Sequence, residues 1–204
     1  MSRALWFLAG ALSLAAVMVV TGVVFIKMST DGFSTHSQPT AIERALATRA
    51  RSMAIPKAAR DRKNPINNSP EVLAEARSHW ADHCAVCHGN DGSGQATIGQ
   101  HLYPPAPDMR EAGTQQLSDG ELFYIVENGI RLSGMPGWGG SDGGEDSWKL
   151  VNFIRHLPGL SQTEIQEMEK LNPKTEAERQ EELRDEQFLR GEPVPDAAPK
   201  AHHH

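Results

Sequence analysis

The two cysteines of this chain are separated by two residues, and a histidine follows the second one directly: residues 84–88 read Cys-Ala-Val-Cys-His. A disulfide across so short a loop would constrain little of the chain. Zinc would need further ligands, and recruiting His83 would crowd four donors into six residues. A thioredoxin-like redox pair would need a preceding strand, and no alternating strand pattern precedes this segment. The two cysteines are therefore expected to act together at one site, in a role other than a disulfide, a zinc site or a thioredoxin-like redox pair.

That role is predicted by the spacing, which is the attachment sequence of c-type haem. Two thiols separated by two residues at the end of a helix can reach the vinyl groups on neighbouring pyrroles and form thioethers. The adjacent imidazole can then bind the iron from the same side. We therefore expect one covalent haem c, held through Cys84 and Cys87, with His88 as a ligand to the iron.

Capping signals predict the helices around this motif. Ser69 is a good N-cap, and Pro70 suits the first position of a helix that would run into the cysteines. Ser118 with Glu121 forms a capping box for a second helix, which Gly129 is placed to end. The chain shows no internal repeat, so we expect an all-α fold with long loops.

Three more helices are predicted after these. Apolar residues recur at helical spacing from 148 to 157. Ser161 with Glu164 would cap the next helix, and a last helix is predicted from Pro173 to about Leu189.

The N-terminus predicts a membrane anchor. Residues 4–26 contain no charged side chain, and at about 1.5 Å per residue they can span a hydrocarbon core of roughly 30 Å. The Ala-Gly-Ala sequence at 9–11 lies inside the apolar run, where cleavage of a signal peptide makes little sense. We therefore expect an uncleaved transmembrane anchor over residues 1–27.

The formal net charge of −6 hides two regions of opposite sign. Residues 43–63 carry seven Lys and Arg against two acids, and residues 164–192 carry ten acids against five bases. The expected organisation is a linker and basic neck over 28–68, a haem domain over 69–160 and a charged helical C-terminal extension over 161–204. The basic run is short and lacks interleaved aromatics, which excludes a nucleic-acid surface. The neck fits either anionic lipid head groups or a solvated helix face.

Residues 70–158 resemble the class I cytochromes c, which bind one haem through histidine and methionine, and look closest to small bacterial membrane-anchored forms. The resemblance rests on Cys-Ala-Val-Cys-His-Gly at 84–89, on the glycine-rich loop to Gly94, and on Gly-Met-Pro at 134–136 before a helix that carries aromatics. It implies a cytochrome c-like arrangement of helices with long loops around one covalent haem.

The resemblance also implies a methionine as the sixth iron ligand, on a loop after the second helix. Met135 stands at that place. A thioether ligand favours Fe(II) and raises the reduction potential relative to two imidazoles. The alternatives are His101, which would give a haem of lower potential, Met109, and an open iron site. A carbonyl of the proline-rich loop at 104–105 would accept the remaining N–H of His88.

Haem attachment of this type implies the outer side of a bacterial inner membrane, so the haem domain is expected in the periplasm on a single-pass anchor. The expected function is electron transfer without a catalytic activity of its own, with a respiratory complex, an oxidase, a reductase or a dehydrogenase as redox partner. The alternatives are a peroxidase-like haem enzyme, which needs an open iron site, and a cytochrome subunit of a dehydrogenase or reductase complex. The histidines at 202–204 could be a native metal-binding end or the remnant of a tag.

Overall fold

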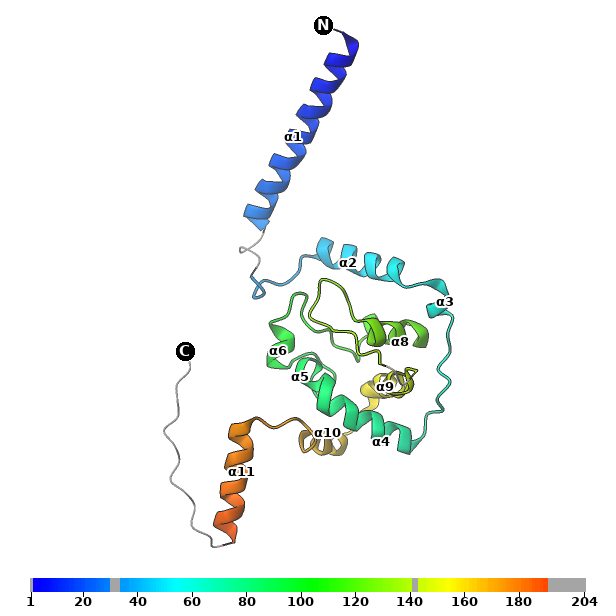
Figure 1. Cartoon of the computed structure of the whole chain (residues 1–204), viewed down its shortest axis with the longest axis vertical. Helices are drawn as coiled ribbons and strands as arrows, with labels where there is room; N and C mark the ends of the chain where they lie inside the picture. Colours follow the sequence, from blue (N-terminus) through cyan, green and yellow to red (C-terminus); the bar gives the residue numbers. More distant parts are fainter. Residues whose placement is uncertain (1, 30–33, 141–142, 191–204) are drawn as a thin grey trace.

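The computed structural model describes residues 2–29, 34–140 and 143–190, and within these ranges the chain is all-α with no strand, which confirms the predicted fold class (Figure 1). The elements are, in chain order, α1 (Arg3–Ser29), α2 (Ala41–Ala54), α3 (Lys57–Arg60), α4 (Pro70–His79), the π-helical turn η1 (Trp80–Cys84), α5 (Ala85–His88), α6 (Thr97–Gln100), α7 (Ala112–Gln115), α8 (Asp119–Asn128), α9 (Glu145–His156), the 3-10 turn η2 (Leu157–Gly159), α10 (Gln162–Glu169) and α11 (Glu176–Leu189).

The N-terminal helix α1 extends away from the other helices (Figure 1). It is long and apolar enough to cross a membrane, and none of the side chains in its apolar window is buried within the protein. A helix that is apolar on all sides must be covered by something other than water. The helix is therefore consistent with the predicted single-pass anchor.

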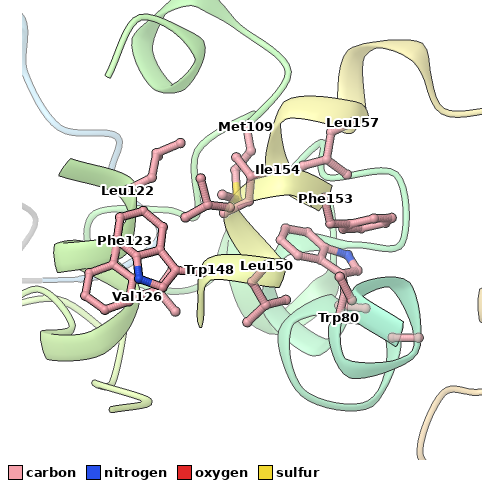
Figure 2. Packing of buried hydrophobic residues seen from close by; sticks show 14 of the residues in the cluster. Trp80, Met109, Leu122, Phe123, Val126, Trp148, Leu150, Phe153, Ile154 and Leu157 are labelled. Carbon is pink, nitrogen blue, oxygen red and sulfur yellow. The ribbon is translucent and has the colours of Figure 1, made fainter. Parts of the chain in front are cut away.

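The core lies where α4, α8 and α9 meet, and α4 forms its most extensive helix contact with α9. Trp80 lies against Phe153, with ring centroids 5.5 Å apart, and the rings of Phe123 and Trp148 stack at 4.1 Å (Figure 2). Met168 of α10 is fully buried in the same cluster, so the start of the C-terminal extension also contributes to the core.

The predicted caps are confirmed. The hydroxyl of Ser69 accepts a hydrogen bond from the first turn of α4, and capping boxes begin α8 at Ser118 and α10 at Ser161. The last helix begins at Glu176, three residues later than predicted. The reason is a hydrogen-bonded pair that the prediction overlooked: Thr175 N–H donates to the Glu178 carboxylate, and Glu178 N–H donates to the Thr175 hydroxyl.

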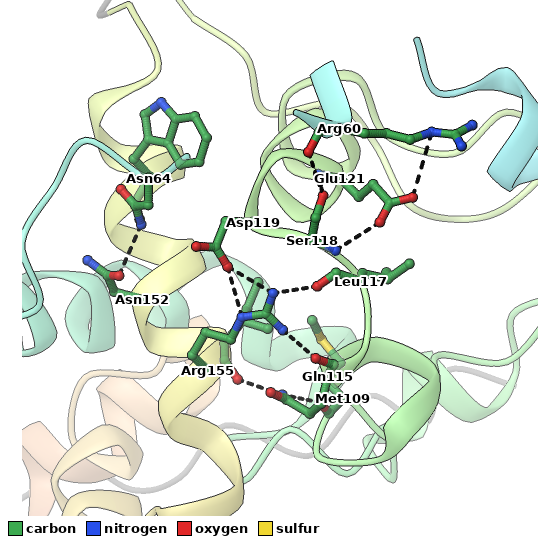
Figure 3. Close-up of polar contacts among 12 residues, drawn as sticks. Arg60, Asn64, Met109, Gln115, Leu117, Ser118, Asp119, Glu121, Asn152 and Arg155 are labelled. Carbon is green, nitrogen blue, oxygen red and sulfur yellow. Dashed lines mark hydrogen bonds and ion pairs between the residues drawn. The ribbon is translucent and has the colours of Figure 1, made fainter. Parts of the chain in front are cut away.

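Residues 55–66, here called the strap, cross the outside of the helical core. Ile55 is 3% exposed, and the guanidinium of Arg62 lies 4.3 Å from the centroid of the Phe123 ring. The side-chain amide of Asn64 donates to the carbonyl of Trp148 at 2.9 Å and to the Asn152 side chain at 3.0 Å (Figure 3). Part of the expected neck is thus packed against α8 and α9.

The strap also holds the N-terminus of α8. The Ser118 hydroxyl donates to the carbonyl of Arg60 at 2.9 Å, and the carboxylate of Glu121 lies 3.8 Å from the Arg60 guanidinium (Figure 3). A Cβ at Gly120 would lie 2.0 Å from the carbonyl oxygen of Ala59, so this close approach requires glycine. No local pattern of residues indicated this contact.

Arg155 connects α9 to the same end of α8. Its Nε donates to Asp119 at 3.0 Å, its Nη1 donates to the carbonyl of Gln115 at 2.7 Å, and its Nη2 donates to the carbonyl of Leu117 (Figure 3). One guanidinium thus binds the carboxylate at the start of α8 and two backbone carbonyls that precede it, which ties α9 to this end of α8.

Candidate functional site

The cysteine motif lies at the end of a helix that changes its winding. After α4, the turn from Trp80 to Cys84 is π-helical, and the N–H of Ala85 bonds to the carbonyl of Trp80, five residues earlier. Residues 85–88 return to α-helix, and Gly89 ends it with a φ of +75°. Two cysteines and a histidine therefore follow one another on a short, well-defined helical end, as the attachment chemistry requires.

The two thiols have the chemistry of reduced, unreactive cysteines. Neither is in a disulfide, and both are half-buried. Burial, with a smaller contribution from the neighbouring Cys87, raises the pKa of the Cys84 thiol to about 12, and burial also raises the pKa of Cys87. Redox-active cysteines show the opposite shift. This pair therefore fits a structural or covalent role better than thiol–disulfide exchange.

His88 is held as a neutral imidazole, because burial lowers its pKa. Its Nδ1 is buried and has no hydrogen-bond partner in the described part of the chain, and its ring lies 5.8 Å from that of Trp80. Buried ring nitrogens are normally hydrogen-bonded, so an orphaned one indicates a missing partner. The hydrogen bond predicted to a carbonyl at 104–105 is not formed in this structure.

These observations fit the haem that the motif implies. Neutral imidazole is the form of histidine that binds metals, and two reduced thiols are the groups that form thioethers. In the described ranges, no group of three or more His, Cys, Asp or Glu side chains is arranged to hold a metal ion by itself, at this motif or elsewhere. The histidines at 202–204 lie outside the described residues.

Met135 lies on a loop that backbone hydrogen bonds tie to the end of α8. Its carbonyl accepts from Ile130 N–H at 3.1 Å, and Trp138 N–H donates to the carbonyl of Val126 at 2.9 Å. Met135 itself is half-buried. The loop is closely packed at Gly129, where φ is +67° and an added Cβ would lie 2.7 Å from the Met135 carbonyl oxygen. Met135 is therefore held in one place rather than carried on a free loop.

The alternative iron ligands each have another contact. Nδ1 of His101 lies 2.7 Å from the carbonyl of Thr97, and its exposed ring meets that of His36 edge-on. Met109 is 8% exposed and belongs to the apolar core near Ile154 (Figure 2). The structure thus gives both residues a role in packing or surface hydrogen bonding.

Near the motif, Trp138 meets the ring of His83 edge-on at 5.3 Å, and His83 stacks on His79 at 4.8 Å. This row of rings extends from the Met135 loop to the turn before Cys84. It brings together two segments that lie far apart in the sequence, and no sequence pattern indicated that contact.

Comparison with known proteins finds a family match over the region that contains this site. Residues 71–154 match the family model described as cytochrome C oxidase, cbb3-type, subunit III. The matched region contains the cysteine motif, the glycine-rich loop and the Met135 loop.

Two curated proteins are similar over the same region. Thiosulfate dehydrogenase of Stutzerimonas stutzeri (strain A1501) is 30% identical over 86 residues, which is 40% of this chain and 26% of that protein. The Cbb3-type cytochrome c oxidase subunit FixPc of Rhizobium leguminosarum bv. viciae is 34% identical over 98 residues, which is 46% of this chain and 32% of that protein. The chain thus spans about a quarter to a third of the length of these relatives.

Proposed function

We propose that this chain is a membrane-tethered periplasmic carrier that transfers single electrons through one covalent haem c, because residues 71–154 match a family model of a cytochrome c oxidase subunit. The observation that carries the proposal is the group formed by Cys84, Cys87 and His88. Two half-buried thiols outside any disulfide and a half-buried imidazole lie together on one short helical end. The relatives, by name a dehydrogenase and an oxidase subunit, support haem-based electron transfer within an oxidoreductase system.

In this proposal Cys84 and Cys87 would hold the porphyrin covalently, and His88 and Met135 would bind its iron. The bound group would supply a one-electron Fe(III)/Fe(II) couple whose potential a methionine ligand raises. The hydrogen bonds of the Met135 loop would keep its thioether in place in both oxidation states. The Thr97 contact of His101 and the burial of Met109 support Met135 over these two alternatives.

The anchor α1 would keep the domain close to partners in the same membrane. Tethering turns an encounter in three dimensions into a search near one surface, which raises the effective concentration of the partner. Attachment of haem c on the outer side of the inner membrane would put the domain in the periplasm. This orientation can be tested with reporters fused after residue 190. A reporter that is active only in the periplasm should be active, and activity only of a cytoplasmic reporter would contradict the proposal.

The haem and its ligands can be tested on the full-length protein, purified from a bacterial host that attaches haem c. After denaturation and extraction with acidified acetone, the colour is expected to stay with the protein. The ferric protein is expected to show the sulfur–iron charge-transfer band of a Met-ligated haem. Colour that leaves with the solvent would refute covalent attachment, and rapid cyanide binding without the band would favour a haem enzyme.

A second candidate is a cytochrome subunit of a larger oxidoreductase complex, which the name of the oxidase subunit among the relatives favours. Under this reading, mild solubilisation of host membranes would release the chain in a stable complex of fixed composition. A free carrier would instead leave the membrane extract as a monomer, and its haem would be reduced and oxidised by partners that do not co-purify.

A further inference from the structure

The helix α2 carries three large apolar side chains that remain mostly exposed. Ile42, Leu46 and Met53 are 71%, 66% and 78% exposed, and no residue of α2 is buried. At 3.6 residues per turn, these three side chains fall within about 40° of one another around the helix axis. They lie on one face of the helix, with Arg49 between Leu46 and Met53, and are here called the α2 stripe.

The opposite side of α2 faces the domain. Arg51, about 160° around the axis from the centre of the stripe, has a buried Nε. The Arg60 guanidinium donates to the carbonyl of Ser52, and Ile55, at the end of the helix, is buried. The domain thus holds α2 with its stripe turned outward, which explains why nothing in the described chain covers it.

The charges around the stripe identify the kind of surface that fits it. Residues 43–63 carry seven Lys and Arg against two acids, and the exposed Arg49 of α2 lies within about 40° of the centre of the stripe. A second copy of the chain would bring the same positive charge to the contact, which repulsion disfavours. An apolar stripe with an arginine on the same face and a basic segment after it instead matches a bilayer, whose interior is apolar and whose anionic head groups attract basic side chains.

The position of α2 along the chain brings it to such a surface. Eleven residues separate the end of α1 at Ser29 from the start of α2 at Ala41, and they can span at most about 40 Å. A membrane that holds α1 is therefore always within reach of α2. This step rests on the proposed anchoring of α1.

We propose that α2 lies in the interface of the membrane that holds α1. Ile42, Leu46 and Met53 would enter the apolar side of the interface, and Arg49 would bind anionic phospholipid head groups. Because the strap joins α2 to α8 and α9, this contact would also set which face of the haem domain looks toward the membrane. The contact of α2 with the membrane would thus fix the orientation of the haem domain.

The test uses full-length holoprotein, one copy per nanodisc, in discs of phosphatidylcholine alone or with phosphatidylglycerol. Hydrogen–deuterium exchange of residues 43–54 is the readout, because an exposed helix without buried side chains opens readily. In phosphatidylglycerol discs we expect exchange slowed by at least about tenfold. The triple variant Ile42→Gln, Leu46→Gln, Met53→Gln is expected to lose this protection and to keep its haem spectrum.

The control variant is Leu183→Gln, which removes an equally exposed apolar side chain from α11 and should keep the protection. Equal exchange in both kinds of disc, or equal protection in wild type and triple variant, overturns the proposal. Because each disc holds one copy, protection there cannot come from a second chain. If residues 3–29 exchange freely in the discs, α1 is not inserted and the proposed anchoring is refuted. If α1 is protected and α2 is not, only the proposal about α2 is refuted.

Discussion

The indole Nε1 of Trp80 donates a hydrogen bond to the carbonyl oxygen of Gly89, 3.0 Å away. Trp80 begins the π-helical turn and Gly89 follows His88, so this bond joins the two ends of the segment that carries both cysteines. The indole is 2% exposed and packs against Phe153. The motif is therefore attached directly to the hydrophobic core.

Replacing this indole tests the attachment. Trp80→Phe keeps an aromatic ring but removes the indole donor, leaves the Gly89 carbonyl with only the Gly92 N–H as a donor, and opens a small cavity. We expect the free energy of unfolding to fall by about 2–4 kcal/mol, measured by urea denaturation of the holoprotein. Trp138→Phe, at a 39% exposed position, should change it by less than about 1 kcal/mol. Equal effects of the two variants would mean that the hydrogen bond contributes nothing.

The assignment of Met135 as an iron ligand predicts a spectroscopic and a redox change. Met135→His should abolish the sulfur–iron charge-transfer band and lower the reduction potential, while the haem stays attached to Cys84 and Cys87. Met109→Leu is the matched control, since it conserves volume in the core and should keep the band at a cost below about 1.5 kcal/mol. Loss of the band in the Met109 variant alone would transfer the assignment to that residue.

The close packing at Gly129 predicts that the Met135 loop is sensitive to one methyl group. In Gly129→Ala the new Cβ would lie 2.6 Å from the amide nitrogen of Gly137, at a φ of +67° that disfavours alanine. We expect a loss of about 1–3 kcal/mol and a weakened charge-transfer band. Gly113→Ala, where a Cβ meets no atom within 4 Å, should be neutral or stabilising by up to about 1 kcal/mol. An unchanged band in Gly129→Ala would show that the loop adapts freely.

Glu164 predicts a pH dependence at the start of the C-terminal extension. Burial opposes ionisation, but hydrogen bonds with the Ser161 backbone and hydroxyl and with His156 outweigh it and lower the pKa of Glu164 from 4.5 to about 2. A carboxyl whose pKa is lower in the folded state stabilises the fold above its unfolded pKa, and this contribution disappears as the pH falls toward 2.

Glu164→Gln should therefore reduce the free energy of unfolding by about 1–2 kcal/mol at pH 7. The difference from wild type should shrink steadily from pH 4.5 toward pH 2. Urea denaturation across this range measures it, with Glu181→Gln on the exposed surface of α11 as control, which should stay within about 0.5 kcal/mol. A difference that does not depend on pH would point to packing rather than to the ionised carboxylate.

The sequence predicted the helix starts at Ser69, Ser118 and Ser161 because a cap depends on residues within four positions of each other. It predicted the haem-binding segment for a similar reason, since the attachment chemistry fixes the spacing of its thiols and imidazole. These parts of the fold and site are encoded locally.

The strap was not predicted, because its contacts join distant residues. Asn64 bonds to Trp148 and Asn152, which lie 84 and 88 residues later, and no pattern in the residues around Asn64 indicates these contacts. The pairing of Met135 with His88 is equally remote in sequence and rested on a family resemblance. It stays a prediction until the spectrum of the holoprotein is measured.

The wide turn from Trp80 to Cys84 limits how this segment can be transplanted. Its extra residue sets the angle between the buried tryptophan and the thiols. Removing one residue would swing every later side chain by roughly 100° around the axis. A designer who grafts the cysteine motif onto a regular helix would therefore point the sulfurs in the wrong direction, unless Trp80 and its whole turn are carried along.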